Sequence, residues 1–308
     1  MRIFSAAIVE PGFFDSAIVD HAVVFGGIVA VVAAAVGVFA VIRGHAFAGE
    51  ALGDIGSTGG SGAYLVGVEP LWGFVGFSLL GAGLMALGET HSHRSRDVDT
   101  GIVVGGALGL SALFLYLDTT HSSTTGAPVT ILFGSLFSVS TSMLPAVIVL
   151  GVLALAVLVL LYRLLLLASL SPDLATARGV SARVIGIAYL LLLAVAVALS
   201  AVTIGAVLST ALLIGPPAAA LLLTNRPGLA AVIAMAIGVG CTWLGILLAY
   251  DSYYWPPLHH GWPVSFFIVA LVFLSYLVAR GTHALRRRRL RPHPSESAAA
   301  LATASQAG

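Results

Sequence analysis

The chain has 308 residues, of which 59% are hydrophobic and only 9% are charged, whereas an ordinary soluble protein carries roughly a quarter of its residues as charged side chains. This composition excludes a typical water-soluble protein and predicts an all-α, multi-pass membrane protein. The absence of lysine excludes a phosphate-binding loop of the GxxxxGKS/T type, the lone Cys241 excludes an intrachain disulfide, and the net charge of +1 gives no indication of nucleic-acid binding.

The apolar segments predict about nine membrane-spanning helices between residues 21 and 282, after a segment at 1–20 that lies along the outer interface. A helix of about 20 apolar residues crosses the ~30 Å hydrocarbon core. Region 184–224 is too long for one crossing, so we expect two helices that turn near residues 200–205. Region 46–68 is less hydrophobic, but its neighbours force it to cross. The other expected spans are 22–42, 71–88, 101–117, 143–168, 228–250 and 264–280.

The arginines predict the orientation, because basic residues collect in short loops on the cytoplasmic side. With nine spans and the N-terminus outside, every arginine except Arg2 falls on or toward the inside. The predicted outer loops, 118–141 and 251–263, contain none. Residues 283–308 then form a cytoplasmic tail, basic at first and rich in Pro, Ser and Ala further on, where we expect disorder.

Two acidic residues fall inside the predicted span 46–68. Glu50 and Asp54 are four residues apart and therefore share one face of a helix. An acid near the bilayer centre costs at least ~2.5 kcal/mol, so such a pair indicates a water-filled path that attracts cations. Carboxylate oxygens also suit divalent cations. The alternative is that the helix begins later and that both acids are solvated in the cytoplasmic loop after Arg43.

A second candidate feature surrounds two prolines. Gly205 and Ser209 form a small-xxx-small face that allows another helix to approach closely. Pro216 and Pro217 remove two backbone donors in mid-membrane, which requires that the freed carbonyls find protein or water. The backbone around Gly215 and Pro216 is therefore either a wall of the cation path or an ordinary kink in a packed helix.

Two loops carry further candidates. The polar loop 171–180 is predicted to be cytoplasmic, and Asp173 at a helix start and Gly179 at its end indicate a short helix that is either a docking surface or an ordinary loop helix. In one outer loop, Asp251, His259 and His260 are candidate metal ligands, because imidazole suits zinc and related metals. Asp118 and His121 lie in the other outer loop. Exposed loop histidines are more often only solvated.

Four blocks of the sequence resemble, in family order, the motifs of the ABC-3 family, the membrane permeases of bacterial ABC transporters for zinc and manganese. Residues 43–54 are similar to its Arg followed by Gly-Asp-Ala-Leu-x-His, residues 99–102 to its Asp-x-Ala-Ile-Gly, and residues 132–135 to its Leu-Phe-Gly-Ser. Residues 205–220 match its most specific signature, Gly-x-x-Leu-x-x-Ala-Leu-Leu-x-x-Pro-Ala-Ala-x-Ala. The resemblance covers about residues 10–280.

The resemblance implies an importer of the bacterial cytoplasmic membrane, built from two copies of the permease, separate ATP-binding cassette ATPase subunits and an extracytoplasmic metal-binding protein. The chain itself would then be no enzyme and hold no permanent cofactor, since ATP binds only the partner and a divalent metal, zinc or manganese, is the cargo. Loop 171–180 lies where the family has Glu-x-Ala-x-x-x-Gly, so Asp173, Ala175 and Gly179 are expected to contact the ATPase.

Two departures from the family pattern bear on the cargo. Asp54 stands where the family has His, and Pro217 stands where it has Ala. Exchanging an imidazole for a carboxylate on the expected metal route leaves zinc, manganese and iron open. The rival function is a secondary, proton-coupled transporter in which Glu50 and Asp54 form a proton relay.

Overall fold

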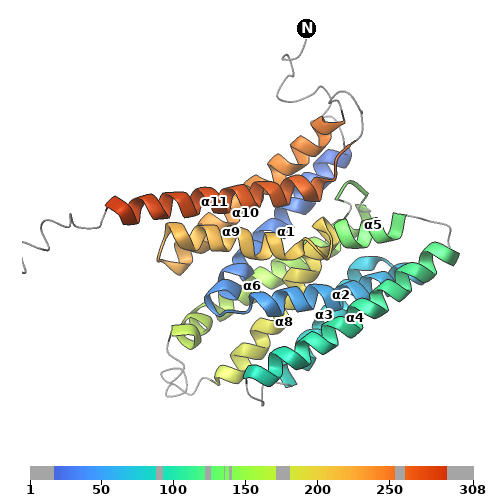
Figure 1. Cartoon of the computed structure of the whole chain (residues 1–308), viewed down its shortest axis with the longest axis horizontal. Helices are drawn as coiled ribbons and strands as arrows, with labels where there is room; N and C mark the ends of the chain where they lie inside the picture. Colours follow the sequence, from blue (N-terminus) through green and yellow to red (C-terminus); the bar gives the residue numbers. More distant parts are fainter. Residues whose placement is uncertain are drawn as a thin grey trace, which may run out of the picture.

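The computed structural model describes residues 17–87, 93–121, 126–134, 136–138, 141–170, 181–253 and 261–289, and every regular element within these ranges is helical (Figure 1). This confirms the all-α expectation for the described part of the chain. The long helices are α1 (Ala17–Ile42), α2 (Ala46–Leu65), α3 (Pro70–Leu87), α4 (His93–His121), α6 (Leu144–Leu170), α8 (Ala182–Ile204), α9 (Ser209–Leu223), α10 (Pro227–Ser252) and α11 (Val264–Arg289).

Seven of these helices are long and apolar enough to cross a membrane, namely α1, α3, α4, α6, α8, α10 and α11. The other two are α2, which is rich in Gly, Ser and Thr, and α9, which has only 15 residues. The break that we expected near residues 200–205 follows Ile204. Nine crossings, and the side on which each terminus lies, remain predictions.

The structure extends two expected elements. Helix α11 continues to Arg289, so the basic start of the expected tail 283–308 is helical, while residues 290–308 and the outer segment 1–16 lie outside the described residues. The expected outer loop 118–141 contains the end of α4, the short helix α5 (Gly126–Phe133), and two 3-10 turns, η2 (Leu136–Ser138) and η3 (Thr141–Met143).

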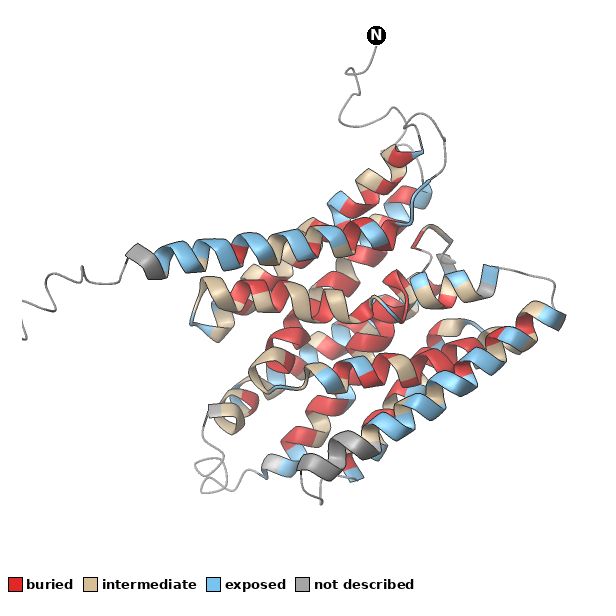
Figure 2. Ribbon diagram, viewed as in Figure 1, coloured by how far each residue is buried: buried red, intermediate tan, exposed pale blue. Residues whose placement is uncertain are grey.

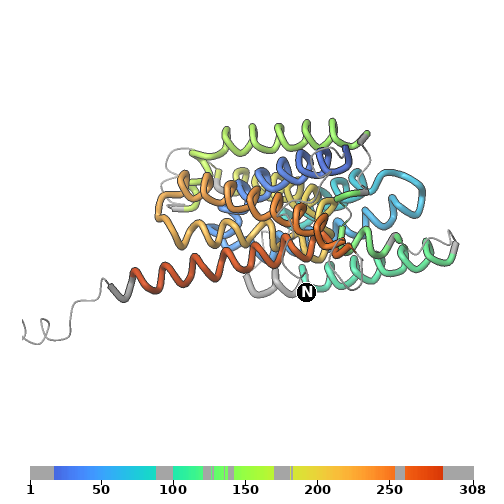
Figure 3. The backbone as a smooth tube through the Cα atoms, turned by 90° about the horizontal axis from the view of Figure 1, so that it is seen from above, coloured from blue at the N-terminus to red at the C-terminus, as the bar shows by residue number. Residues whose placement is uncertain are grey.

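Helices α1 and α8 form the centre of the bundle, and most of their residues are buried (Figure 2). Helices α2, α3 and α4 pack together at one edge, while α9, α10 and α11 pack together at the opposite edge (Figure 1). Helix α6 covers α1 as an outer layer (Figure 3). The helix that carries Glu50 and Asp54 therefore lies between the centre and one edge.

Close packing against α3 explains much of the glycine content of α2. A Cβ atom on Gly59 would overlap the backbone carbonyl of Gly73, and a Cβ atom on Gly73 would overlap that of Gly59. At the next residue of α2, a Cβ atom on Gly60 would overlap the ring of Phe74. Small residues that let two backbones approach are a common device of membrane helix packing. The glycines on this side of α2 thus belong to a close helix–helix contact.

The break between α8 and α9 is held by the last turn of α5 and by Gly134, which follows it. Gly205 has φ +93° and Gly134 has φ +74°, backbone conformations that favour glycine. The N–H of Ala206 donates to the carbonyl of Ile131 at 3.0 Å, and a Cβ atom on Gly205 would overlap the carbonyl of Leu132. The Leu-Phe-Gly-Ser block and the start of the Gly-x-x-Leu signature are therefore joined by backbone contacts.

Candidate functional site

The acidic pair lies in the first half of α2. The helix begins at Ala46, ahead of both Glu50 and Asp54, so the alternative in which the helix starts later does not agree with the structure. The side chain of Glu50 is exposed and that of Asp54 is half-buried. The structure thus places two acids on one helical face in the first half of α2, which is the half that the arginines predict to be nearer the cytoplasm.

Helix α9 approaches the acid-bearing part of α2, but not through the backbone around Gly215 and Pro216, as we expected. Leu213 lies 2.8 Å from the position that a Cβ atom on Gly49 would occupy, and the hydroxyl of Ser209 lies 3.1 Å from the corresponding position on Gly53. Gly215, in contrast, abuts Val272 of α11. The structure therefore brings Ser209 and Leu213 to the acid-bearing helix and does not bring Gly215 there.

The two prolines are buried inside α9, which continues through them. Pro217 has no N–H for the carbonyl of Leu213, four residues earlier. That carbonyl instead points at α1, where a Cβ atom on Gly37 would overlap it. The carbonyl freed by Pro217 thus faces the close contact between α9 and α1 at Gly37. A direct role of Gly215 or Pro216 in a cation route remains a prediction.

Hydroxyl groups that the sequence analysis did not single out continue the polar face of α2 beyond Asp54. The Ser57 hydroxyl lies 2.7 Å from the Asp54 carbonyl and 3.3 Å from the Ser111 hydroxyl of α4. The Thr58 hydroxyl donates to the Ala107 carbonyl at 2.7 Å, and the Ser61 and Ser111 hydroxyls are 3.2 Å apart. The signal was present in the sequence, because positions 54, 57, 58 and 61 share one helical face.

A ring stack fixes the linker between α1 and α2. Tyr189 of α8 is fully buried, and its hydroxyl donates to the Val36 carbonyl at 3.2 Å. The Arg43 guanidinium lies 5.5 Å from the centre of the Tyr189 ring, and the His45 ring stacks on it at 5.6 Å. Cation–π contacts of this kind are worth about 0.5–2 kcal/mol. The start of α2, and with it Glu50, is therefore held against α8.

The remaining candidates are not brought into one site. Asp251 is partly exposed near the end of α10, while His259, His260 and the loop that contains Asp173, Ala175 and Gly179 lie outside the described residues. Asp118, expected in an outer loop, lies in α4 and is only 2% exposed. Within the ranges that the structure describes, no three His, Cys, Asp or Glu side chains are grouped closely enough to hold a metal ion.

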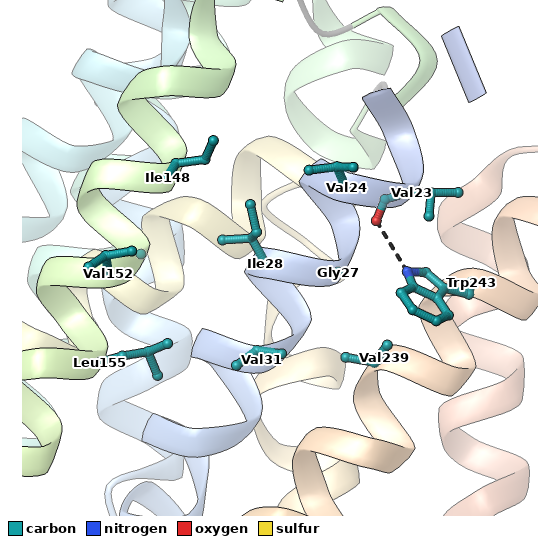
Figure 4. A pocket seen from close by; sticks show the side chains of 11 residues that line it. Val23, Val24, Gly27, Ile28, Val31, Ile148, Val152, Leu155, Val239 and Trp243 are labelled. Atoms are coloured by element: carbon teal, nitrogen blue, oxygen red, sulfur yellow. Dashed lines mark hydrogen bonds between the residues drawn. The ribbon is translucent and has the colours of Figure 1, made fainter. Parts of the chain in front are cut away.

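A cavity of about 490 Å³ lies between α1, α6 and α10 (Figure 4), and no residue of α2 lines it. Apart from Trp243, whose indole N–H donates to the Val23 carbonyl at 3.1 Å, aliphatic residues such as Ile28, Val152 and Leu155 line it. A divalent cation needs oxygen, nitrogen or sulfur ligands, so this cavity does not suit a metal ion.

Comparison with known proteins agrees with the motifs. A family model described as the ABC 3 transport family matches residues 15–279. The manganese transport system membrane protein MntC of Halalkalibacterium halodurans is 30% identical over 232 residues, which are 74% of this chain and 78% of the relative. The chelated iron transport system membrane protein YfeC of Yersinia pestis is 27% identical over 272 residues, 87% of this chain and 90% of the relative.

The fold is also similar to a solved one. A structure of PsaBC from Streptococcus pneumoniae in complex with Fab has a TM-score of 0.72 at 24% identity, over 87% of this chain and 92% of that chain. The expected family, and the expected location in the membrane, are confirmed. The chain belongs to the ABC 3 transport family and is a multi-pass protein of the bacterial cytoplasmic membrane.

Proposed function

We propose that this chain is the permease subunit of an ATP-binding cassette importer for a divalent transition metal ion. The observation that carries the proposal is the acidic pair of α2 within a chain that matches the ABC 3 transport family over most of its length. Two carboxylates on one face of a membrane helix are unfavourable toward lipid and favourable toward a cation. Family membership does not favour the rival, a proton-coupled secondary transporter.

The ligand chemistry favours manganese or ferrous iron over zinc. Asp54 supplies a carboxylate where the family has an imidazole, and carboxylate, hydroxyl and carbonyl oxygens suit manganese better than the nitrogen-rich sites typical of zinc. The relatives described above are named for manganese and for chelated iron. Zinc transport by this chain remains open, and the ion is a cargo rather than a permanent cofactor.

In this proposal the route passes Glu50 and Asp54, and α9 forms its second wall. In α9, Ser209 and Leu213 are the residues that face α2, since they lie against Gly53 and Gly49. Gly215 and Pro216 then support α9 indirectly, because Gly215 packs against Val272 of α11 and Pro216 is buried inside the bundle. A site of few ligands suits transport, because an ion that is bound weakly is released readily.

The proposal includes three protein partners. A separate ATPase subunit docks on loop 171–180 through Asp173, Ala175 and Gly179, since a chain without lysine lacks the phosphate-binding lysine of such ATPases. An extracytoplasmic metal-binding protein delivers the ion to the face that carries Asp251, His259 and His260. A second copy of the permease completes the membrane part of the importer, in which the N-terminus lies outside.

Metal uptake by charge-neutralised variants tests the proposal. Glu50→Gln and Asp54→Asn keep shape and remove charge, so each should reduce manganese uptake strongly at unchanged expression. Glu69→Gln is the matched control, because Glu69 is exposed in the linker at the opposite end of α2. Asp54→His should retain transport and shift preference toward zinc. Wild-type uptake by the double variant Glu50→Gln/Asp54→Asn would overturn the proposed route.

A further inference from the structure

The central helix α1 is open to its surroundings on one face. Between residues 22 and 40, all of which the structure describes, every residue of α1 is buried except five, and each of these five lines the cavity between α1, α6 and α10 (Figure 4). They are Val23, Val24, Gly27, Ile28 and Val31. Val24, Ile28 and Val31 follow one another at four and three residues, so they share one helical face. The cavity is therefore the place where this part of α1 meets the outside of the bundle.

The arrangement of α6 and α10 produces this opening, because both helices pack on α1 but meet each other at one end. There the Tyr162 hydroxyl of α6 lies 3.0 Å from the position that a Cβ atom on Gly228 of α10 would occupy. The Tyr162 ring also packs edge-on against Phe39 of α1 at 5.7 Å. Further along, Val152 of α6 and Trp243 of α10 stand on opposite sides of the cavity (Figure 4). We call this space, closed at Tyr162, the α6–α10 groove.

The lining of the α6–α10 groove suits an apolar ligand. Every residue that lines it is Gly, Val, Ile or Leu except Trp243, whose indole N–H already donates to the Val23 carbonyl. A polar ligand would lose its hydrogen bonds to water without replacing them, and water itself does not fill apolar cavities. Val24, Val152 and Trp243 are 47%, 61% and 49% exposed, so the groove is open on its outer side. In a membrane, what lies on that side is hydrocarbon.

The length and depth of the groove match one acyl chain. From Val24 to Val31 and from Ile148 to Leu155, its walls cover roughly 10 Å along each helix. One leaflet contributes about 15 Å of hydrocarbon, half of the ~30 Å core. In the orientation that the arginines predict, α1 begins and α10 ends on the outside, so the groove lies in the outer half of the membrane. Its volume of about 490 Å³ is typical of a site for a small apolar ligand.

We propose that the α6–α10 groove is a lipid site that holds one acyl chain of a phospholipid of the outer leaflet. The chain covers the open face of α1 and fills a space that would otherwise be empty, and empty space inside a packed protein lowers its stability. The competing occupant is a second copy of the protein, whose α6 also exposes large apolar side chains.

The fluorescence of Trp243 reports on the groove, because its indole is part of the lining. The chain has four tryptophans, so Trp72→Phe, Trp255→Phe and Trp262→Phe together leave Trp243 alone. This protein, purified in detergent, is titrated with phosphatidylcholine that carries bromine in the middle of its acyl chains, since bromine quenches an indole on contact. Quenching should saturate at a few lipids per protein. In the control that retains only Trp72, which is 54% exposed on α3, quenching should rise steadily with lipid content.

Two phenylalanine variants of α6 test whether the groove itself binds the chain. Val152→Phe places a ring in the groove, whereas Val149→Phe adds the same ring at a residue that is equally exposed and does not line it. The first should abolish the saturable quenching of Trp243, and the second should leave it unchanged. Quenching of Trp243 that rises as steadily as that of Trp72, or that persists in Val152→Phe, would overturn the proposal.

Thermal unfolding gives a second measurement that does not depend on fluorescence. Adding phospholipid to the delipidated protein should raise the melting midpoint of the wild type and of Val149→Phe on the order of 5 °C. Val152→Phe should melt higher than both without lipid and should gain little from it, because its ring replaces the chain. If Trp243 is not quenched and Val152→Phe disrupts the dimer in size-exclusion chromatography, a second copy covers the groove and the lipid site is refuted.

Discussion

The contact between α2 and α3 allows one prediction to be worked out from two glycines of the same helix. In α3, a Cβ atom on Gly73 would overlap the carbonyl of Gly59 and would lie 2.8 Å from the Cβ of Ala63. A Cβ atom on Gly76, one turn further along α3, would meet nothing within 4 Å. We expect Gly73→Ala to destabilise the protein and Gly76→Ala to leave it unchanged or to stabilise it.

The magnitude follows from two opposing effects. Replacing Gly by Ala within a helix gains up to about 1 kcal/mol, and this gain applies to both variants. Forcing a methyl group into a packed contact costs about 1–3 kcal/mol, and here the atoms in the way belong to backbone, which yields less readily than a side chain. The difference between Gly73→Ala and Gly76→Ala is therefore about 1–3 kcal/mol, all of it from the α2–α3 contact.

Thermal unfolding of the two purified variants in detergent measures this difference. For a chain of this size, each kcal/mol shifts the midpoint by about 2–4 °C, so Gly73→Ala should melt on the order of 5 °C below Gly76→Ala. Because the added methyl group would push α2 away from α3, manganese uptake by Gly73→Ala should also fall. Equal melting temperatures would show that α2 and α3 do not touch at Gly59 and Gly73, and would refute this account of the glycines.

Two further predictions concern the α8–α9 break and the topology. Gly205→Ala should destabilise the protein by about 1–3 kcal/mol more than Gly44→Ala in the same melting assay. Both residues have positive φ, but only Gly205 abuts a backbone carbonyl. Equal losses of stability would mean that the carbonyl of Leu132 does not constrain Gly205. In a Cys241→Ala background, Tyr253→Cys should react with an impermeant maleimide on intact cells, and Leu285→Cys should react only after permeabilisation. The two side chains are 58% and 61% exposed and are predicted to lie on opposite sides of the membrane. Labelling of Leu285→Cys on intact cells would reverse the predicted orientation.

The helical content was predictable because it depends on the local run of apolar residues. Most spans start and end within a few residues of their expected positions, as α3 and α6 do at 70–87 and 144–170. The ends that differ most are the start of α4 at His93 and the end of α11 at Arg289, where both helices extend into polar sequence. Hydropathy identifies the part of a helix that lies in lipid, and it gives no signal for the turns that extend beyond it.

The site was less predictable because it depends on which helices become neighbours. The spacing of Glu50 and Asp54 was sufficient to place them on one face. The sequence alone did not show that Gly215 contacts Val272 of α11 rather than α2, or that Asp118 turns inward. Each of these facts depends on the rotation of one helix against another, and an almost uniformly apolar helix has too weak a pattern to fix its rotation.

Helix α2 combines two properties that most membrane helices keep apart. On the α3 and α9 sides, its glycines allow contacts so close that a single methyl group would disturb them. On the α4 side, it presents the hydroxyls of Thr58 and Ser61 to a helix that, among the described elements, packs mainly on α2. An element held by close backbone contacts changes position at high cost, whereas one with few buried contacts moves readily. Helix α2 is therefore suited to keep Glu50 and Asp54 in place during transport, whereas α4 is the helix beside it that can move more readily.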